Sequence, residues 1–421
     1  MDKPQTLKGF RDFLPKQMIV RKKAIEILTS VFESYGFEPL QTPTLEYGSV
    51  LMGKYGEEAD KLLYTFEDRG GRTVGLNYDL TVPTARVLAQ YPDLPKPFKR
   101  YQIQPSYRAE NTQKGRYRQF TQCDIDIIGP KSAVSDAEIL AVIHESLTKL
   151  HIPKFTIHVN SRAILYDLMK MAHIPEDKWN TVLQTVDKIN KKTKDELDAE
   201  LVTKGFASGL FSGTIHPLLE QISAQYTEHQ TTSDPYVNDV ITYAKAMGVV
   251  HMQFNPSIVR GLDYYTGPIF ETVVDEPAIG SVTGGGRYDN LIQQLGGPDI
   301  TAVGTTLGLD RLCDVIEELH LWNDLPTTVT TVLVSQFSPD MTMQAVTTAH
   351  TLRAAGIATE LYQDPQAKLE KQLKYALSKG IPYLVIQGPE EIEKHTVILK
   401  DLTTKEQEAL PIAHVIEKLS R

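Results

Sequence analysis

The chain has 421 residues, of which 41% are hydrophobic and 23% charged, the values of an ordinary globular protein with room for about two or three domains. A formal net charge of −9 argues against a protein that coats nucleic acid nonspecifically, but it leaves room for a local basic surface that docks one RNA. Two cysteines give neither a disulfide framework nor a zinc spacing, no stretch approaches the ~18 apolar residues of a membrane span, and the first residues lack a signal-peptide core, so we expect a cytoplasmic protein with no membrane partner.

The first predicted element is a helix from Met18 to Tyr35, in which apolar residues recur at helical spacing. Gly36 suits a left-handed stop at its end. The segment that follows is predicted to be extended, because Pro39 and Pro43 are excluded from a helix interior.

A strand is then expected to end near Asp79 and Thr81, followed by a helix that begins at Pro83. Polar residues just before a helix have two interpretations. They cap the free backbone N–H groups of the first turn, or they contact a ligand at the end of the strand. The residues alone leave both open.

Residues 98–126 are predicted to form a hairpin, two strands flanking a polar loop. Taken at period two, one face of the second strand carries a cation, an aromatic ring, an amide and two carboxylates: Arg118, Phe120, Gln122, Asp124 and Asp126. Such a face is costly to bury unless a ligand or partner satisfies it. We therefore interpret it as a binding floor.

Charged residues gather at the loop end of the same hairpin. Arg108 and Glu110 end the first strand, and Lys114, Arg116 and Arg118 follow in the loop and the second strand. Cations at this density suit phosphate. The alternative is a solvated hairpin whose charges pair with one another, but that alternative leaves an aromatic ring facing water among charges.

After the hairpin we expect a helix over residues 135–150 and a strand over 154–160. Residues 161–252 then change to short helices, predicted at 162–174, at 176–189, in a segment ending at Gly205 and at 239–248. Helices between two parts of a sheet indicate an inserted subdomain. It is either a clamp over a long ligand or structural padding.

The sheet is predicted to resume with a strand over residues 268–274. Arg260 lies ahead of it, in a turn beside Tyr264 and Tyr265, where a lone arginine is usually a surface residue stacked on a ring. Three consecutive glycines, 284–286, follow before a helix. They either allow a ligand to approach the backbone closely or form a tight turn, and they lack the spacing of a dinucleotide site.

A last strand of this part leads into a helix, with Gly308 at the junction and Arg311 in the first helical turn. A cation at that position opposes the helix dipole and is unfavourable unless an anion lies nearby, such as a phosphate. Beyond a linker rich in proline and threonine, strands and helices alternate over about 95 residues, which predicts a separate small α/β domain.

These segments together resemble the histidyl-tRNA synthetase family, within the class II aminoacyl-tRNA synthetases. The hairpin looks like motif 2, LGLDR like motif 3, and the first helix and strand like motif 1, whereas KGRYRQF, QCDIDI and RGLDYYTGPIFE look specifically histidyl. Three departures stand out. Asn77 replaces a frequent arginine, the pair Asn111 and Thr112 replaces Arg-Pro, and the pair Thr305 and Thr306 departs in motif 3.

The resemblance implies an α/β (α+β) fold with an antiparallel catalytic sheet flanked by helices. The implied domains are 1–160 and 253–325 for the catalytic core, 161–252 for a helical insertion, and 330–421 for an anticodon-binding domain. It also implies a homodimer joined through motif 1.

The implied reaction activates L-histidine with ATP, giving histidyl-adenylate and pyrophosphate, and then transfers histidine to the 3′ end of its tRNA. The attacking carboxylate is already an anion, so catalysis needs positioning and charge stabilisation rather than a protein base. Mg²⁺ is expected to accompany ATP, with ligands that the sequence does not identify.

The resemblance assigns catalysis to Arg108 and Arg260. It assigns histidine binding to Asp79, Thr81, Arg108, Gln122, Asp126, Arg260, Tyr264 and Tyr265. It assigns ATP binding to Arg108, Glu110, Arg118, Phe120, Arg260 and Arg311, and tRNA contacts to Lys114 and Arg116.

Two other classes of protein compete with this interpretation. Chains of the same fold serve as non-catalytic regulatory subunits or as sensors of uncharged tRNA, but the regulatory subunits generally have degraded motifs and lack the C-terminal domain that this chain carries. A synthetase for another amino acid would keep motifs 1 to 3 without RGLDYYTG.

Overall fold

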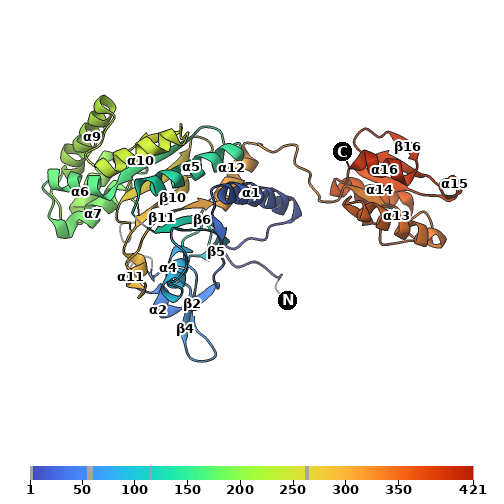
Figure 1. The fold of residues 1–421 in the computed structure, drawn as a ribbon, viewed down its shortest axis with the longest axis horizontal. Coiled ribbons are helices and arrows are strands. Elements are labelled where there is room, and N and C mark those ends of the chain that lie inside the picture. Colours follow the sequence, from blue (N-terminus) through green and yellow to red (C-terminus); the bar gives the residue numbers. More distant parts are fainter. Residues whose placement is uncertain (1–2, 55–59, 114, 130, 261–264, 421) are drawn as a thin grey trace. The chain divides into compact units, whose positions relative to one another are not determined.

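The computed structural model describes residues 3–54, 60–113, 115–129, 131–260 and 265–420 (Figure 1). The chain forms two compact units, Met1–Asp12 with Ala24–Leu321, and Phe13–Lys23 with Trp322–Arg421. Within the described ranges, no helix is long and apolar enough to cross a membrane.

The first unit is built on an eight-stranded sheet. Its spatial order is β1 (Glu38–Pro39), β5 (Phe98–Tyr107), β6 (Gln119–Gly129), β11 (Thr301–Gly308), β10 (Ser281–Tyr288), β9 (Pro268–Val274), β7 (Phe155–Ser161) and β8 (Met252–Phe254). The pairs at the two edges are parallel, and those between them are antiparallel. The expected antiparallel sheet is confirmed.

Helices cover both faces of this sheet (Figure 1). On one side lie α5 (Ala133–Lys149) and α12 (Leu309–Glu318), and on the other lie α4 (Thr81–Gln90) and α11 (Leu291–Gln294). The apolar stripe of α4 packs on side chains of the sheet and of α11, in a cluster that includes Val82, Ala85, Leu88, Ile128, Tyr288, Leu291, Ile292 and Ala302. This packing holds the N-terminus of α4 against the sheet.

The N-terminal helix α1 (Pro15–Ser34) begins three residues before the expected start. Leu28 and Phe32 are fully buried, and Gly36 has the left-handed φ of +76° that ends the helix. The extended segment after it forms β1 and, after a break, β2 (Leu45–Tyr47), as expected from its prolines.

Strand β2 belongs to a small three-stranded antiparallel sheet, in the order β2, β4 (Thr73–Leu76) and β3 (Thr65–Glu67), and the short helix α2 (Gly48–Leu51) follows β2. The strand expected to reach residue 79 therefore ends at Leu76, and helix α4 starts two residues before Pro83. The Asp79 carboxylate explains the earlier start, because it accepts hydrogen bonds from the backbone N–H groups of Thr81 and Val82, both at 3.1 Å.

The helical insertion contains α6 (Arg162–Met171), η1 (Glu176–Lys178), α7 (Trp179–Val186), α8 (Lys194–Thr203), η2 (Phe211–Ile215), α9 (His216–His229) and α10 (Pro235–Ala246). The hydrophobic core of the insertion continues into the sheet, because the cluster of buried residues that joins its helices also includes Ile258, Val259 and Ile269. Helix α9 was not predicted from the sequence. Among its described residues only Leu219 is buried, with Leu218 and Ile222 partly buried against the same cluster, so its apolar stripe is narrow.

The second unit contains a five-stranded sheet in the order β13 (Thr359–Leu361), β12 (Val332–Val334), β14 (Tyr383–Ile386), β15 (Val397–Asp401) and β16 (Gln407–Leu410). The first three strands are parallel and the last two pairings are antiparallel. The helical segments are η3 (Pro339–Met341), α13 (Thr342–Ala354), α14 (Leu369–Lys379), α15 (Pro389–Glu393) and α16 (Ile412–Leu419). Strands and helices alternate as the sequence predicted.

Candidate active site

The loop end of the β5–β6 hairpin brings a cation beside an aromatic ring. Arg108 Nε donates to the carbonyl of Tyr78 at 3.1 Å, and its guanidinium carbon lies 4.3 Å from the centre of the Tyr78 ring and 5.0 Å from that of Phe120. The Arg108 N–H donates to the carbonyl of Arg118 at 2.9 Å, so backbone pairing continues beyond the two strands. Arg108 and Phe120 therefore lie together, as their shared motif predicted.

The charges of the hairpin loop are partly paired within the loop. Arg118 Nε donates to the carbonyl of Glu110 at 3.1 Å, and Arg116 Nη1 lies 3.6 Å from a carboxylate oxygen of Glu110. The Arg116 side chain is nevertheless about half exposed, at 48%. Lys114 lies outside the described residues. The alternative of charges that pair with one another thus holds for Glu110 and Arg116.

Arg260 lies over the run of glycines in β10. Its Nη1 donates to Glu271 Oε1 at 3.1 Å, to the carbonyl of Thr283 at 3.2 Å and to Ser281 Oγ at 3.4 Å. A Cβ atom added at Gly284 would overlap this guanidinium. The glycines are in a strand and allow close approach, so the alternative of a tight turn is wrong. The approaching group within the protein is the side chain of Arg260.

Arg311 lies in the first turn of helix α12, which begins immediately after the expected glycine junction, since Gly308 is the N-cap residue. Its Nε donates to the carbonyl of Gly115 at 3.0 Å, and its Nη1 donates to the carbonyl of Ser281. Burial lowers the pKa of Arg311, and the charges of Arg116 and Arg260 lower it further. Guanidinium groups from three distant segments therefore repel one another here; Glu110 and Glu271 offset this repulsion in part, and a bound anion would offset it further.

The polar face of β6 is buried and partly satisfied by the protein itself. Asp126 forms an ion pair with Arg100 Nη2 and accepts a hydrogen bond from the hydroxyl of Tyr288, each at 2.5 Å, and Arg100 is 0% exposed. Gly304 allows this packing, because a Cβ atom there would overlap the Asp126 carboxylate. At Asp126, the face of β6 that the sequence predicted to bind a ligand therefore also forms a buried ion pair with Arg100.

Gln122, on the same face, has one end satisfied and the other not. Its Nε2 donates to Thr306 Oγ1 at 3.1 Å. Thr306 is one of the two motif 3 residues at which the sequence departs from the family pattern. Its Oε1 is buried and has no hydrogen-bond partner within the part of the chain that the structure describes. An unpaired buried acceptor favours a ligand that carries an N–H group.

Tyr265 is half-buried and packs against the apolar clusters of both the insertion and the sheet. Its ring lies beside Gly286, where an added Cβ atom would be 3.1 Å from Tyr265 Cδ1. Tyr264, expected to act with it, lies outside the described residues.

Asp124 is a further carboxylate of this face to which the sequence analysis gave no role. Burial raises its pKa to about 7; the positive charge of Arg100 opposes the shift, and the negative charges of Asp126 and Asp79 add to it. The period-two pattern placed Asp124 on this face, and only the neighbouring strands show that it is fully enclosed. Three carboxylates act on one another here, an arrangement that favours a cationic group.

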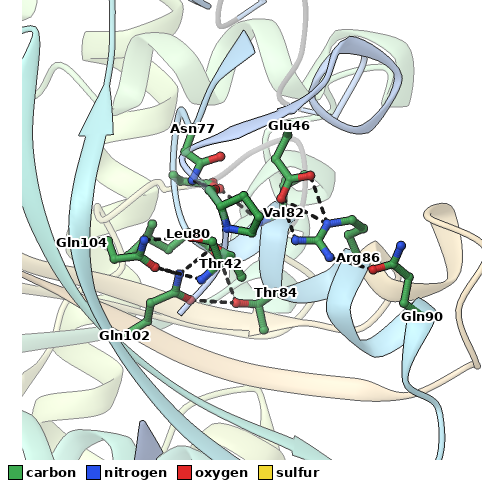
Figure 2. A network of polar contacts seen from close by, with 12 residues as sticks. Thr42, Glu46, Asn77, Leu80, Val82, Thr84, Arg86, Gln90, Gln102 and Gln104 are labelled. Atoms are coloured by element: carbon green, nitrogen blue, oxygen red, sulfur yellow. Dashed lines mark hydrogen bonds and ion pairs between the residues drawn. The ribbon is translucent and has the colours of Figure 1, made fainter. Parts of the chain in front are cut away.

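A polar network supports the start of helix α4 (Figure 2). Gln104 exchanges hydrogen bonds with the backbone of Thr42 at 2.9 and 3.1 Å, and Gln102 Nε2 donates to Thr42 Oγ1 at 2.8 Å. Asn77, one of the departures from the family pattern, is buried and donates to the carbonyl of Pro43 at 2.8 Å. The network fixes the chain just before Asp79.

The same region is held from outside by a bidentate ion pair between Arg86 of α4 and Glu46 of β2, with the closest atoms 2.7 Å apart (Figure 2).

Among the residues described, no group of three or more histidine, cysteine, aspartate or glutamate side chains is arranged to hold a metal ion.

Comparison with known proteins identifies similar chains. The family model described as histidyl-tRNA synthetase matches residues 9–312, and that described as anticodon binding domain matches residues 331–421. The histidine–tRNA ligase of Rhodopirellula baltica is 41% identical over 430 residues, covering 98% of this chain and 97% of its own length. That of Cytophaga hutchinsonii is 38% identical and covers 100% of both chains. The crystal structure of histidyl-tRNA synthetase from Nostoc sp. PCC 7120 matches with a TM-score of 0.83 at 28% identity, covering 100% of both chains.

Proposed function

The chain belongs to the histidyl-tRNA synthetase family, and from that premise we propose which of its residues bind the substrates and carry the reaction. Its function is that of an ATP-dependent histidine–tRNA ligase, because its full-length relatives are histidine–tRNA ligases and both family domains are present. These relatives favour the ligase over the regulatory alternative.

The proposed activation site lies where Arg108, Arg260 and Arg311 meet Phe120. The histidine carboxylate attacks the α-phosphate of ATP and expels pyrophosphate, and it needs no base because it is already an anion. Arg108 and Arg260 contact the α-phosphate and the carboxylate, Arg311 holds the γ-phosphate, and Phe120 stacks on adenine. Glu110 and Arg118 orient the nucleotide.

One observation supports this assignment above the others: Arg311, held by the carbonyls of Gly115 and Ser281, lies where Arg116 and Arg260 also bring positive charge, and these charges and burial lower its pKa although Glu110 and Glu271 oppose the shift. Like charges brought together from the hairpin, from the segment before β9 and from helix α12 cost free energy that Glu110 and Glu271 offset only in part. A triphosphate removes this cost. The site thus stabilises charge that is present in bound ATP and redistributed in the transition state.

Histidine is proposed to lie along the buried face of β6, between Asp79, Thr81, Gln122 and Asp126, with Tyr264 and Tyr265 beside it. The unpaired Gln122 Oε1 supplies an acceptor for an N–H group of histidine. The carboxylates favour the α-ammonium group and an imidazole N–H, and leaving them unpaired would penalise an amino acid with an apolar side chain.

Mg²⁺ is proposed to enter with the triphosphate and to neutralise part of its charge. Glu110 and Glu271 are the carboxylates whose charges act on Arg311. They are therefore the side chains best placed to hold a cation beside the phosphates.

The tRNA is proposed to contact Arg116, whose side chain is half exposed at the loop of the hairpin, and Lys114 beside it in sequence. Residues 1–160 and 253–325 form the proposed catalytic core, 161–252 the insertion and 330–421 the domain that reads the anticodon. We further propose a cytoplasmic homodimer whose contact lies at the motif 1 elements, helix α1 and the strand after it.

Aminoacylation of tRNA by the purified chain tests the function. With ATP, Mg²⁺, labelled amino acid and unfractionated tRNA, histidine alone among the standard amino acids should become attached to tRNA. Arg260→Ala should lose activity by about a hundredfold, the usual cost of one charge-stabilising contact. Arg69→Ala, which removes an exposed arginine in the turn between β3 and β4, is the matched control and should be as active as the wild type. Attachment of another amino acid would refute the assignment.

A further inference from the structure

A short N-terminal segment, Leu7–Arg11, lies against the hairpin that carries the proposed ATP contacts. Gly9 has a φ of +89°, and its carbonyl accepts a hydrogen bond from the Arg118 N–H at 2.9 Å. A Cβ atom at Gly9 would be 2.7 Å from both Arg118 Cγ and Thr112 Cγ2. Glycine is therefore required here both by the backbone conformation and by the close contact with the hairpin.

The next residue anchors the segment to the other strand of the hairpin. The ring of Phe10 packs against Tyr107, at the end of β5, and against Tyr64, with ring centres 6.5 and 6.4 Å apart. The segment thus contacts both sides of the hairpin at its loop end.

Arg11 then joins the hairpin to helix α12. Its guanidinium carbon lies 3.3 Å from the centre of the Tyr117 ring, and its Nη2 pairs with Asp310 Oδ1 at 2.5 Å. The other carboxylate oxygen of Asp310 accepts from the Thr121 N–H at 2.7 Å. Because Asp310 is only 6% exposed, one nearly buried carboxylate bridges Arg11, strand β6 and the first turn of α12.

The two residues next to this bridge are proposed ATP contacts at opposite ends of the nucleotide. Phe120 precedes Thr121 and is proposed to stack on adenine, whereas Arg311 follows Asp310 and is proposed to hold the γ-phosphate. Arg311 is also repelled by Arg116 and Arg260, and this repulsion opposes docking of α12 on the hairpin before ATP binds. The pairing of β11 with β6 ends at Gly308 and Gln122, so contacts beyond that pairing hold the first turn of α12 on the hairpin.

We propose that Arg11 is a positioning residue for ATP: through Asp310 it fixes the N-terminus of α12 to strand β6 and so sets the distance between the adenine and γ-phosphate contacts. This inference rests on the proposed function. Arg11 itself contacts no substrate. Its removal deletes the ion pair with the nearly buried Asp310 carboxylate, which loosens the arrangement of both ATP contacts.

The test measures histidine-dependent exchange of pyrophosphate into ATP, without tRNA, for Arg11→Ala, Arg11→Lys, Asp310→Asn and the double variant Arg11→Ala with Asp310→Asn. Lys8→Ala, which removes an exposed cation of the same segment, is the matched control. Thermal unfolding of each variant is followed in parallel.

Arg11→Ala should raise the KM for ATP by about tenfold, the effect of losing one charged hydrogen bond, and change the KM for histidine by less than about twofold. Arg11→Lys should recover part of the loss, because it keeps the charge but not the planar contact with the Tyr117 ring. Since Arg11 acts through Asp310, the double variant should be no worse than Asp310→Asn alone.

Equal changes in the two KM values, unchanged kinetics, or losses that add in the double variant would each overturn the proposal. If Arg11→Ala fails to fold, Arg11→Lys decides, and a folded Arg11→Lys variant with wild-type KM for ATP refutes it. A wild-type protein with no histidine-dependent exchange would instead refute the proposed function.

Discussion

Replacing Gly284 by alanine should disable Arg260 while leaving the sheet folded. The added Cβ atom would overlap the Arg260 guanidinium and would be 2.6 Å from its Nη2. The obstructed group is the far end of a flexible side chain, and Gly284 does not have the left-handed backbone that excludes alanine. The guanidinium therefore has to move, by about 1 Å if ordinary van der Waals contact is restored.

The expected loss of activity follows from this displacement. A misplacement of about 1 Å of a positioning group costs on the order of a hundredfold in rate, or about 2.7 kcal/mol of transition-state stabilisation. The stability should change by less than about 1 kcal/mol, since no backbone atom has to shift. Activity and stability should thus separate.

Gly285→Ala offers the contrast, because its Cβ atom would overlap the carbonyl of Gly304 and be 2.6 Å from Thr305 Cα, both backbone atoms of the paired strand. It should destabilise the sheet by several kcal/mol. Gly213→Ala, with nothing within 4 Å of the added atom, is the neutral control. Pyrophosphate exchange and thermal unfolding are measured for all three variants. Wild-type exchange in a folded Gly284→Ala protein, or loss of exchange only in proportion to unfolding, would refute the placement of Arg260.

Three further predictions concern the nucleotide, a buried carboxylate and the insertion. Phe120→Ala should raise the KM for ATP by about tenfold or more through the loss of base stacking worth about 1–3 kcal/mol, and an unchanged KM in the exchange assay would exclude that stacking. Asp124 has its pKa raised by burial from 3.8 to about 7, so the folded state keeps a proton that the unfolded chain releases, and stability falls as the pH rises through this window. Asp124→Asn should therefore match the stability of the wild type near pH 4 and exceed it by a few kcal/mol at pH 8, because each unit of pKa shift is worth about 1.4 kcal/mol. A difference in unfolding free energy between the two proteins that does not vary with pH would contradict this. For Glu200 of the insertion, burial alone would raise the pKa of the carboxyl group, but hydrogen bonds from three lysine side chains lower it. The ionised Glu200 therefore stabilises the fold above pH 4.5, the pKa of the unfolded chain, and this stabilisation is lost as the pH falls below that value. Glu200→Gln should destabilise the protein by about 1–2 kcal/mol at pH 7, a value discounted for the partial exposure of the lysines, and should have little effect at pH 3, as measured by denaturant unfolding.

The sequence predicted elements whose pattern is local. Strand β9 has the predicted bounds, 268–274, because its alternation of side chains is regular and a glycine precedes it. The junction at Gly308, with Arg311 in the first turn of α12, was also predicted correctly from the change of period. In both places the residues that define the element are neighbours along the chain.

Features that depend on distant partners were not predictable in this way. The pairing of Arg11 with Asp310 joins residues 299 positions apart, and nothing at either position indicates the other. The three glycines looked equally suited to a turn, and only the antiparallel pairing of β10 with β11 and β9 shows them inside a strand.

The proposed binding floor was predicted in part. Period two placed the polar residues of β6 on one face correctly, but Arg100 on the opposite strand was not recognised as the internal partner of Asp126. The register of the hairpin, which sets Arg100 opposite Asp126, decides this pairing, and neither strand alone indicates it.

The central claim is that this chain activates histidine with ATP at a site that includes Arg260. Histidine-dependent exchange of pyrophosphate into ATP by the purified protein, with no tRNA added and with Arg260→Ala beside it, tests the claim most directly. The wild type should exchange with histidine and with no other standard amino acid, and the variant should be slower by about a hundredfold. A well-folded wild-type protein that does not exchange would contradict the claim and return the chain to the regulatory or sensor class.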